Sequence, residues 1–177
     1  MTSFVALLRA VNVGGNNKIA MPVLREMFEA SGYTNVTTFI QSGNVVFDGA
    51  GTKGAALVRD IETSITRTFG LRIDVVVRSA RELADAIKAN PFADRVHDPA
   101  TLHIAFLNDA PDRARLETLD RARFEPDEFA IGRREVYLHC PNGVGRSKLP
   151  TALASKLAPA TMRNWNTVTK LAELAAR

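Results

Sequence analysis

The sequence contains a single cysteine, and this scarcity excludes two classes of protein. Cys140 alone cannot form an internal disulfide, nor can it supply a cysteine-based zinc site. Its expected role is that of a small packed residue. The sequence also lacks a long hydrophobic run, because the apolar stretch FVALL ends before Arg9 and is too short for a signal-peptide core or a membrane span. We therefore expect a cytoplasmic protein without a membrane partner.

Motifs that would identify an enzyme are also missing. The turn NVGGNNK matches neither G-x-x-x-x-G-K-[ST] nor G-x-G-x-x-G, so it is neither a P-loop nor a dinucleotide fingerprint. The H-E-x-x-H, G-x-S-x-G and S-x-x-K patterns are absent too, and His97, His103 and His139 show no metal-ligand spacing. The sequence therefore predicts no metal and no cofactor. It leaves the catalytic residues unknown and the question of enzymatic activity open.

Charge is present but unevenly distributed. The formal net charge is +4, yet residues 143–177 hold six Lys or Arg against one acid, whereas residues 79–142 hold nine against twelve. A basic end can attract phosphates or nucleic acid, although spread-out cations on helices are more often a solvated face. Both interpretations stay open on the sequence alone.

Hydrophobic patterning in residues 1–78 predicts a β-α-β-β-α-β order. This is the order of a ferredoxin-like unit, in which two helices cover one face of a four-stranded antiparallel sheet. The predicted fold class is therefore α+β, with a ferredoxin-like N-terminal unit. The expected elements are the strand SFVALLRAVNV, the helix MPVLREMFEASG, the strands NVTTFIQ and NVVFDG, a helix that ends at Gly70, and the strand RIDVVVR.

Residues 79–177 predict a second, related α+β unit, closely packed against the first and without a sequence repeat. Because no Gly/Ser linker separates the halves, one domain is the alternative to two. The last helix is expected to start within PATMRNWNTV, with Thr161 as its cap. The other expected elements are the helix ARELADAIKANPF, the strand TLHIAFLN, a short helix near residues 112–121, a hairpin formed by EFAIG and REVYLHC, and a further helix before the last.

Three stretches, LLRAVNVGGNNKIAM, FIQSGNVVF and SKLPTALASKL followed by ATMRNWNTVTKL, occur in this order over essentially the whole chain. Through them the sequence resembles an uncharacterised bacterial family, catalogued as domain of unknown function 1697. The family often has glycine where Ala10 stands here. The resemblance implies paired ferredoxin-like α+β units and no established activity, so no catalytic residue is carried over from it.

The first candidate site lies in two polar turns of the first half. The turn NVGGNNK follows a buried strand and precedes a helix, so its backbone N–H groups and a lysine could hold an anion. The bend in IQSGNVVF presents further polar side chains. Turn formation alone explains both stretches equally well. The candidate ligand-binding residues here are Arg9, Asn12, Gly14, Gly15, Lys18, Gln41, Ser42 and Asn44.

The second candidate site depends on cations at predicted helix starts. In GVGRSKLP, Arg146 and Lys148 lie before or within a first turn that Ser147 could cap, and Arg163 is expected in the first turn of the last helix. A cation at that end opposes the helix dipole unless an anion, or a carboxylate of the protein, offsets it. This repeated feature suggests a phosphate or carboxylate site that comprises Arg146, Ser147, Lys148, Arg163 and Asn164.

Three functions remain open from the sequence. The first is binding of a phosphorylated, nucleotide-like ligand or of RNA, although the aromatic signature of RNA-recognition motifs is absent. The second is an enzyme acting on a small phosphorylated or carboxylated metabolite. The third is a non-catalytic scaffold or oligomerising protein. The oligomeric state, the ligand and the convergence of the two candidate sites cannot be read from the sequence.

Overall fold

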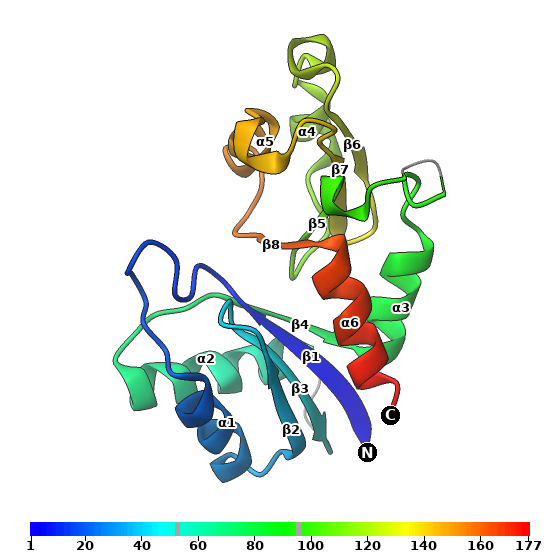
Figure 1. The fold of residues 1–177 in the computed structure, drawn as a ribbon. Coiled ribbons are helices and arrows are strands. Elements are labelled where there is room, and N and C mark those ends of the chain that lie inside the picture. Colours follow the sequence, from blue (N-terminus) through cyan, green and yellow to red (C-terminus); the bar gives the residue numbers. More distant parts are fainter. Residues whose placement is uncertain (52–53, 95–96) are drawn as a thin grey trace. The chain divides into compact units, whose positions relative to one another are not determined.

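A computed structural model describes residues 1–51, 54–94 and 97–177 of the chain. These residues form two compact units, Met1–Ala84 with Lys170–Arg177 and Asp85–Thr169. Each unit contains one four-stranded antiparallel sheet (Figure 1). The α+β class predicted from the sequence is confirmed. The boundary predicted between residues 78 and 79 falls inside a strand, and that division stays a prediction.

The first unit has the predicted order of elements. Its sheet is arranged β2-β3-β1-β4, with antiparallel pairing throughout. This is the split arrangement expected of a β-α-β-β-α-β chain. The elements are β1 (Thr2–Leu8), α1 (Met21–Ala30), β2 (Thr34–Phe39), β3 (Asn44–Gly49), α2 (Ala55–Phe69) and β4 (Val75–Ser79).

Helices α1 and α2 cover one face of this sheet (Figure 1). Alternate residues of a strand point to the same face, so every second residue of β1 packs against the helices. Helix α2 contributes an apolar stripe at a spacing of four residues. Each fully buried aliphatic side chain in such a core contributes roughly 1.5–3 kcal/mol. The packed residues include Phe4, Ala6 and Leu8 of β1, Leu24 and Phe28 of α1, and Leu57, Ile61 and Ile65 of α2.

Strand β1 is shorter than its apolar run suggests. It ends at Leu8, whereas the sequence predicts extension to Val13. Ala10 and Asn12 have φ of 53° and 55°, in the left-handed region and outside the extended conformation of a regular strand. The chain therefore turns away from the sheet although Val11 remains buried. Gly70 closes α2 in the left-handed conformation, as the sequence predicts.

The second unit contains four strands and several short helices. Its sheet is arranged β6-β7-β5-β8, again antiparallel. None of the helices in the described ranges combines the length and apolar character that a bilayer span requires. Two helices, α3 (Ala80–Lys88) and α6 (Trp165–Ala175), run across the boundaries between the two units along the chain. The elements wholly within the second unit are β5 (Leu102–Phe106), α4 (Arg113–Glu117), β6 (Glu128–Ile131), β7 (Glu135–His139), α5 (Leu149–Ala154) and β8 (Thr161–Asn164), with 3-10 turns at Pro99–Thr101, Arg121–Phe124 and Val144–Arg146.

The second unit repeats the topology of the first. From β5 to β8 its elements again follow a β-α-β-β-α-β order, and the two sheet orders correspond strand by strand. The registers correspond as well. Ala6 of β1 pairs with Val45 and Val77 of its neighbours, and Ala105 of β5 pairs in the same way with Val136 and Met162. The architecture is therefore duplicated, although the sequence shows no repeat.

The sequence interpretation missed strand β8. Residues 161–164 were expected to open the last helix, but they pair with β5, and α6 begins only at Trp165. The expected cap at Thr161 is also wrong. Asn164 caps the helix, since its Oδ1 accepts the Thr167 N–H at 2.8 Å. A four-residue strand carries too little periodicity to be distinguished from a helix start.

Candidate functional site

The structure brings together the two polar turns of the first unit. The Asn12 amide nitrogen donates to Ile19 O at 2.9 Å and to Gln41 O at 2.8 Å, and Asn12 Oδ1 accepts the Ile19 N–H at 2.9 Å. The turn after β1 is thus tied to the β2–β3 hairpin. Because these bonds occupy the side chain of Asn12, its role here is to shape the turns.

Hairpin residues 42–44 are used in a similar way. Asn44 is buried and donates to Phe39 O and to Ser42 Oγ, both at 3.0 Å. Gly43 has a φ of 79°, and a Cβ at this position would lie 2.9 Å from the Leu8 Cβ. Only glycine permits such a close approach with this backbone conformation. The polar character of this bend is therefore explained largely by its folding.

The exposed part of the first candidate site consists of Arg9, Gly14, Gly15, Lys18 and Gln41. Both glycines have left-handed φ angles, and open space surrounds them. Helix α1 begins at Met21, several residues beyond the glycines. Arg9 pairs with Asp74 at 3.2 Å, so an acid of the protein already offsets part of its charge. Anion binding at these turns stays a prediction.

The second unit gathers three of the predicted residues around one depression. Arg146, Ser147 and Lys148 line it from the segment before α5, and a second segment faces them from the approach to β6. The depression has a volume of about 490 Å³. We call it the second-unit pocket. Its lining consists of Arg123, Phe124, Glu125, Pro126, Asp127, Asn142, Gly143, Arg146, Ser147 and Lys148.

Local structure explains how the segment before α5 is held. Arg146 ends a 3-10 turn, and Lys148 occupies the N-cap position of α5. Ser147 Oγ accepts the Leu149 N–H at 3.0 Å, so the predicted capping bond exists although the cap position is one residue later. Both cations are exposed. Their placement at the start of a short helix agrees with the sequence prediction.

The charges of the second-unit pocket do not form ion pairs with one another. Three cations, Arg123, Arg146 and Lys148, share the lining with Glu125 and Asp127. Across the described ranges, no salt bridge joins any of these five groups to a partner. Such a mixed lining can bind a ligand that carries both a negative group and hydroxyl or amino donors.

Cys140 lies beneath this segment. It is fully buried, as the sequence predicts for a packed residue. Burial raises the pKa of its thiol, the nearby Asp127 carboxylate adds to this, and a hydrogen bond with Ser147 opposes it. A thiol with a raised pKa is a poor nucleophile at neutral pH. We therefore assign Cys140 a packing role next to the pocket and not a role as a nucleophile.

Arg163 and Asn164 are not among the residues that line the second-unit pocket. Arg163 was expected in the first turn of the last helix, but it lies on β8, where its Nη1 donates to Met162 O at 3.0 Å. Burial lowers the pKa of its guanidinium to about 10. The dipole argument for Arg163 is thus wrong, while contact of these two residues with a ligand stays a prediction.

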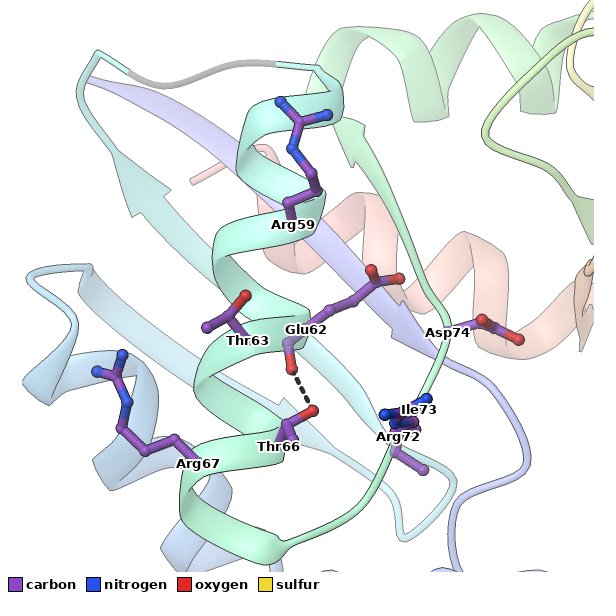
Figure 2. Close-up of a pocket in the computed structure, with 8 residues that line it drawn as sticks. All are labelled: Arg59, Glu62, Thr63, Thr66, Arg67, Arg72, Ile73 and Asp74. Carbon is purple, nitrogen blue, oxygen red and sulfur yellow. Dashed lines mark hydrogen bonds between the residues drawn. The ribbon is translucent and has the colours of Figure 1, made fainter.

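Sequence reasoning missed Arg123 and Phe124. Both lie within residues 79–142, where acids outnumber bases, and only the β6–β7 hairpin brings that stretch back beside Arg146. Sequence reasoning also missed a groove in the first unit, shown in Figure 2, which we call the α2 groove. It has a volume of about 580 Å³ and is lined by Arg59, Glu62, Thr63, Thr66, Arg67, Arg72, Ile73 and Asp74.

Metal ligands and histidines add no further site. Over the described ranges, no three His, Cys, Asp or Glu side chains are grouped so that they could hold a metal ion. His139 Nδ1 lies 3.5 Å from Glu128 Oε2. His103 is buried, and burial lowers its pKa, with a backbone hydrogen bond at Thr101 partly opposing this.

The fold and the pocket define a two-unit α+β protein with a cationic depression in its second unit. The family described as "Protein of unknown function (DUF1697)" matches residues 1–137, and the chain belongs to this family. The matched range ends before the third stretch that carried the resemblance. No curated protein matches the chain.

A solved structure extends the likeness to the rest of the chain. The conserved bacterial protein SP0830 from Streptococcus pneumoniae is similar over 98% of each chain, with a TM-score of 0.80 and 23% sequence identity. At this identity the likeness shows the fold. It supports the duplicated α+β architecture, including the segments beyond residue 137.

Proposed function

We propose that the protein binds a phosphorylated, nucleotide-like ligand in the second-unit pocket. The observation that carries this proposal is the grouping of Arg123, Arg146 and Lys148 around one depression without ion-pair partners in the described chain. Exposed cations repel one another when they are gathered in this way, and a bound anion relieves that repulsion. Guanidinium and ammonium groups are the common donors to phosphate oxygens.

The rest of the lining favours a nucleotide over a bare phosphate. Phe124 is half-buried and offers an aromatic ring to a planar base. The carboxylates of Glu125 and Asp127 can accept hydrogen bonds from sugar hydroxyls. The volume of about 490 Å³ lies within the range of roughly 300–1,000 Å³ that is usual for small-molecule sites.

We also propose a cytoplasmic location. The single thiol is buried and cannot form an internal disulfide, which fits a reducing compartment. Nucleotides and phosphorylated metabolites are abundant ligands in that compartment.

A thermal-shift series tests the binding proposal. The wild-type protein is heated with nucleoside mono-, di- and triphosphates and with sugar phosphates, alongside the variant Arg146→Gln/Lys148→Gln. A ligand at a hundredfold excess over its Kd should stabilise the wild type by about 2.7 kcal/mol, and the variant should lose most of this shift. A matched control, Arg133→Gln/Arg177→Gln, removes the same charge from exposed positions outside the pocket lining.

The control should keep the wild-type response. The proposal fails if no phosphorylated compound shifts the wild type, or if the pocket variant and the control lose the shift equally. Phe124→Leu adds a test of the base-binding role. This substitution should weaken the binding of nucleotides more than the binding of sugar phosphates, since only nucleotides place a ring against the Phe124 side chain.

A further inference from the structure

The α2 groove presents three arginines whose guanidinium groups do not converge. Arg59 and Arg67 leave α2 in different directions, and Arg72 comes from the segment between α2 and β4 (Figure 2). All three side chains are exposed. Because the groups are spread along the groove, they cannot all contact one small anion. A ligand with several separated negative charges can meet them together.

The two acids of the groove are engaged with other groups. Glu62 Oε1 accepts the Val75 N–H at 2.9 Å, and Asp74 Oδ2 lies 3.2 Å from Arg9 Nη1. Throughout the described part of the chain, no salt bridge joins the three arginines of the groove to an acid. Their positive charge is therefore offset less than the composition of the lining suggests.

The wall of the groove is fixed by local hydrogen bonds. Thr66 Oγ1 lies 3.0 Å from Glu62 O and 3.1 Å from Leu71 O, so its hydroxyl ties the last turns of α2 to the following segment. Gly70 adopts the left-handed conformation that ends the helix, and its N–H donates to Thr66 O. A site that is ordered before binding loses less conformational entropy when a ligand arrives.

Helix electrostatics explains only one of the three arginines. Arg67 lies in the last turn of α2, where a cation is favourable toward the helix dipole. Arg59 lies two turns earlier, and Arg72 lies outside the helix. Neither the helix dipole nor an acid of the described chain offsets the charges of Arg59 and Arg72. These charges are therefore available to a polyanion from outside the protein.

We infer that the α2 groove binds the phosphodiester backbone of a single-stranded nucleic acid. Arg59 and Arg67 are eight residues apart, which corresponds to about 12 Å along the helix axis. A strand with stacked bases, whose phosphates are about 3.4 Å apart along the axis, carries roughly three to four phosphates over that length. Thr63 lies between the two arginines on the same side of the helix, and its hydroxyl is a common phosphate donor.

Sequence preference is not expected at this groove. Its lining contains no aromatic ring on which bases could stack. Contacts to phosphates position a strand without reading its bases. The groove belongs to the first unit and the proposed nucleotide site to the second, so this inference does not depend on the proposed function.

Fluorescence anisotropy with labelled twelve-nucleotide oligo-dT and oligo-dA tests the inference on the full chain. Both probes should bind equally. With three phosphate contacts, the slope of log K against log salt concentration should be about −2, a loss of roughly twentyfold between 50 and 200 mM salt. The triple variant Arg59→Gln/Arg67→Gln/Arg72→Gln should abolish this binding.

A charge-matched control separates the groove from net charge. Arg25→Gln/Arg133→Gln/Arg177→Gln removes three exposed arginines that do not line the groove, and it should bind like the wild type. The inference is overturned if wild type binds neither probe at 50 mM salt, or if both triple variants weaken binding equally. Tighter binding of a matching duplex or of polyglutamate would also overturn it.

The two proposals can fail separately. The groove triple variant should keep its thermal shift with nucleotides, and Arg146→Gln/Lys148→Gln should keep its affinity for oligo-dT. Circular dichroism of each variant confirms that it is folded. Loss of oligonucleotide binding in the Arg146→Gln/Lys148→Gln variant alone would assign the polyanion to the second unit and overturn the inference.

Discussion

Arg78 and Arg163 occupy equivalent positions in the two sheets. Each is the last-but-one residue of the strand that completes its β-α-β-β-α-β unit, and each donates from Nη1 to the carbonyl oxygen of the preceding residue at 3.0 Å. The following residue caps a helix in both cases: Ser79 Oγ accepts the Glu82 N–H, and Asn164 Oδ1 accepts the Thr167 N–H.

Replacement of Arg78 by alanine should destabilise the fold strongly. Its side chain is 1% exposed, so the variant removes a large packed stem and leaves a cavity. We expect the free energy of unfolding to fall by about 3 kcal/mol. Arg163→Ala should cost less, because that side chain is only partly buried. Chemical denaturation measures both, and an equal or smaller loss at Arg78 would contradict the prediction.

Asn164→Ala should destabilise the protein by about 1 kcal/mol through loss of the α6 cap. The side-chain oxygen of Asn164 satisfies the Thr167 N–H, which otherwise lacks a partner within the helix. Asn166→Ala is the matched control, since Asn166 is an exposed residue of the same helix. This substitution should change the free energy of unfolding by no more than about 0.5 kcal/mol. An equal loss of stability in the two variants would show that the Asn164 cap does not stabilise α6.

Asn12 allows the contribution of a backbone conformation to be separated from that of hydrogen bonds. Asn12→Ala removes three hydrogen bonds and leaves alanine at a left-handed φ of 55°, a conformation that asparagine tolerates better. Asn12→Gly removes the bonds without that strain. We expect Asn12→Ala to be less stable than Asn12→Gly by about 1 kcal/mol. Thermal unfolding of the two variants tests this order, and the reverse order would refute it.

His103 should make stability depend on pH. Burial lowers the pKa of its imidazole, so the unfolded chain binds the proton more readily than the folded protein. The contribution of His103 is complete above its unfolded pKa of about 6.5 and is lost as the pH falls from there toward the folded pKa. His103→Phe, which installs the residue found at the equivalent Phe4, should remove this fall.

Urea midpoints between pH 5 and pH 7.5 measure the effect of His103. A parallel loss of stability in wild type and His103→Phe would show that other groups cause it.

Lys148 should lower the stability of the ligand-free protein while supporting binding. It stands at the N-cap of α5, where a cation meets the positive end of the helix dipole. Lys148→Gln should therefore raise the free energy of unfolding by about 0.3 kcal/mol and reduce the nucleotide-induced thermal shift. Lys156 follows the other end of α5, so Lys156→Gln should lower stability slightly and leave the shift intact. Parallel effects of the two substitutions would contradict the dipole argument.

The first unit could be predicted from sequence because its elements are long and regular. The fifteen residues of α2 repeat an apolar stripe several times, and Gly70 marks its end. The end of β1 could not be predicted, because Val11 is apolar and buried although the chain has already left the sheet. Burial alone does not identify a strand.

The second unit was harder to predict because its elements are short. Strand β8 has four residues, and its Met and Arg favour a helix as readily as a strand. Its pairing with β5 depends on residues about sixty positions away, which no local pattern reports. The same limit applies to the pocket, where Arg123 meets Arg146 only through the hairpin between them.

The duplicated sheets give this chain two copies of one scaffold whose linking segments differ. At corresponding register positions, Asn44 of the first copy stands where the second has Glu135, and Phe4 where it has His103. The two copies thus share a framework of paired strands and carry different side chains at the same position of it. Two identical subunits related by symmetry lack this freedom, because any substitution in one appears in both.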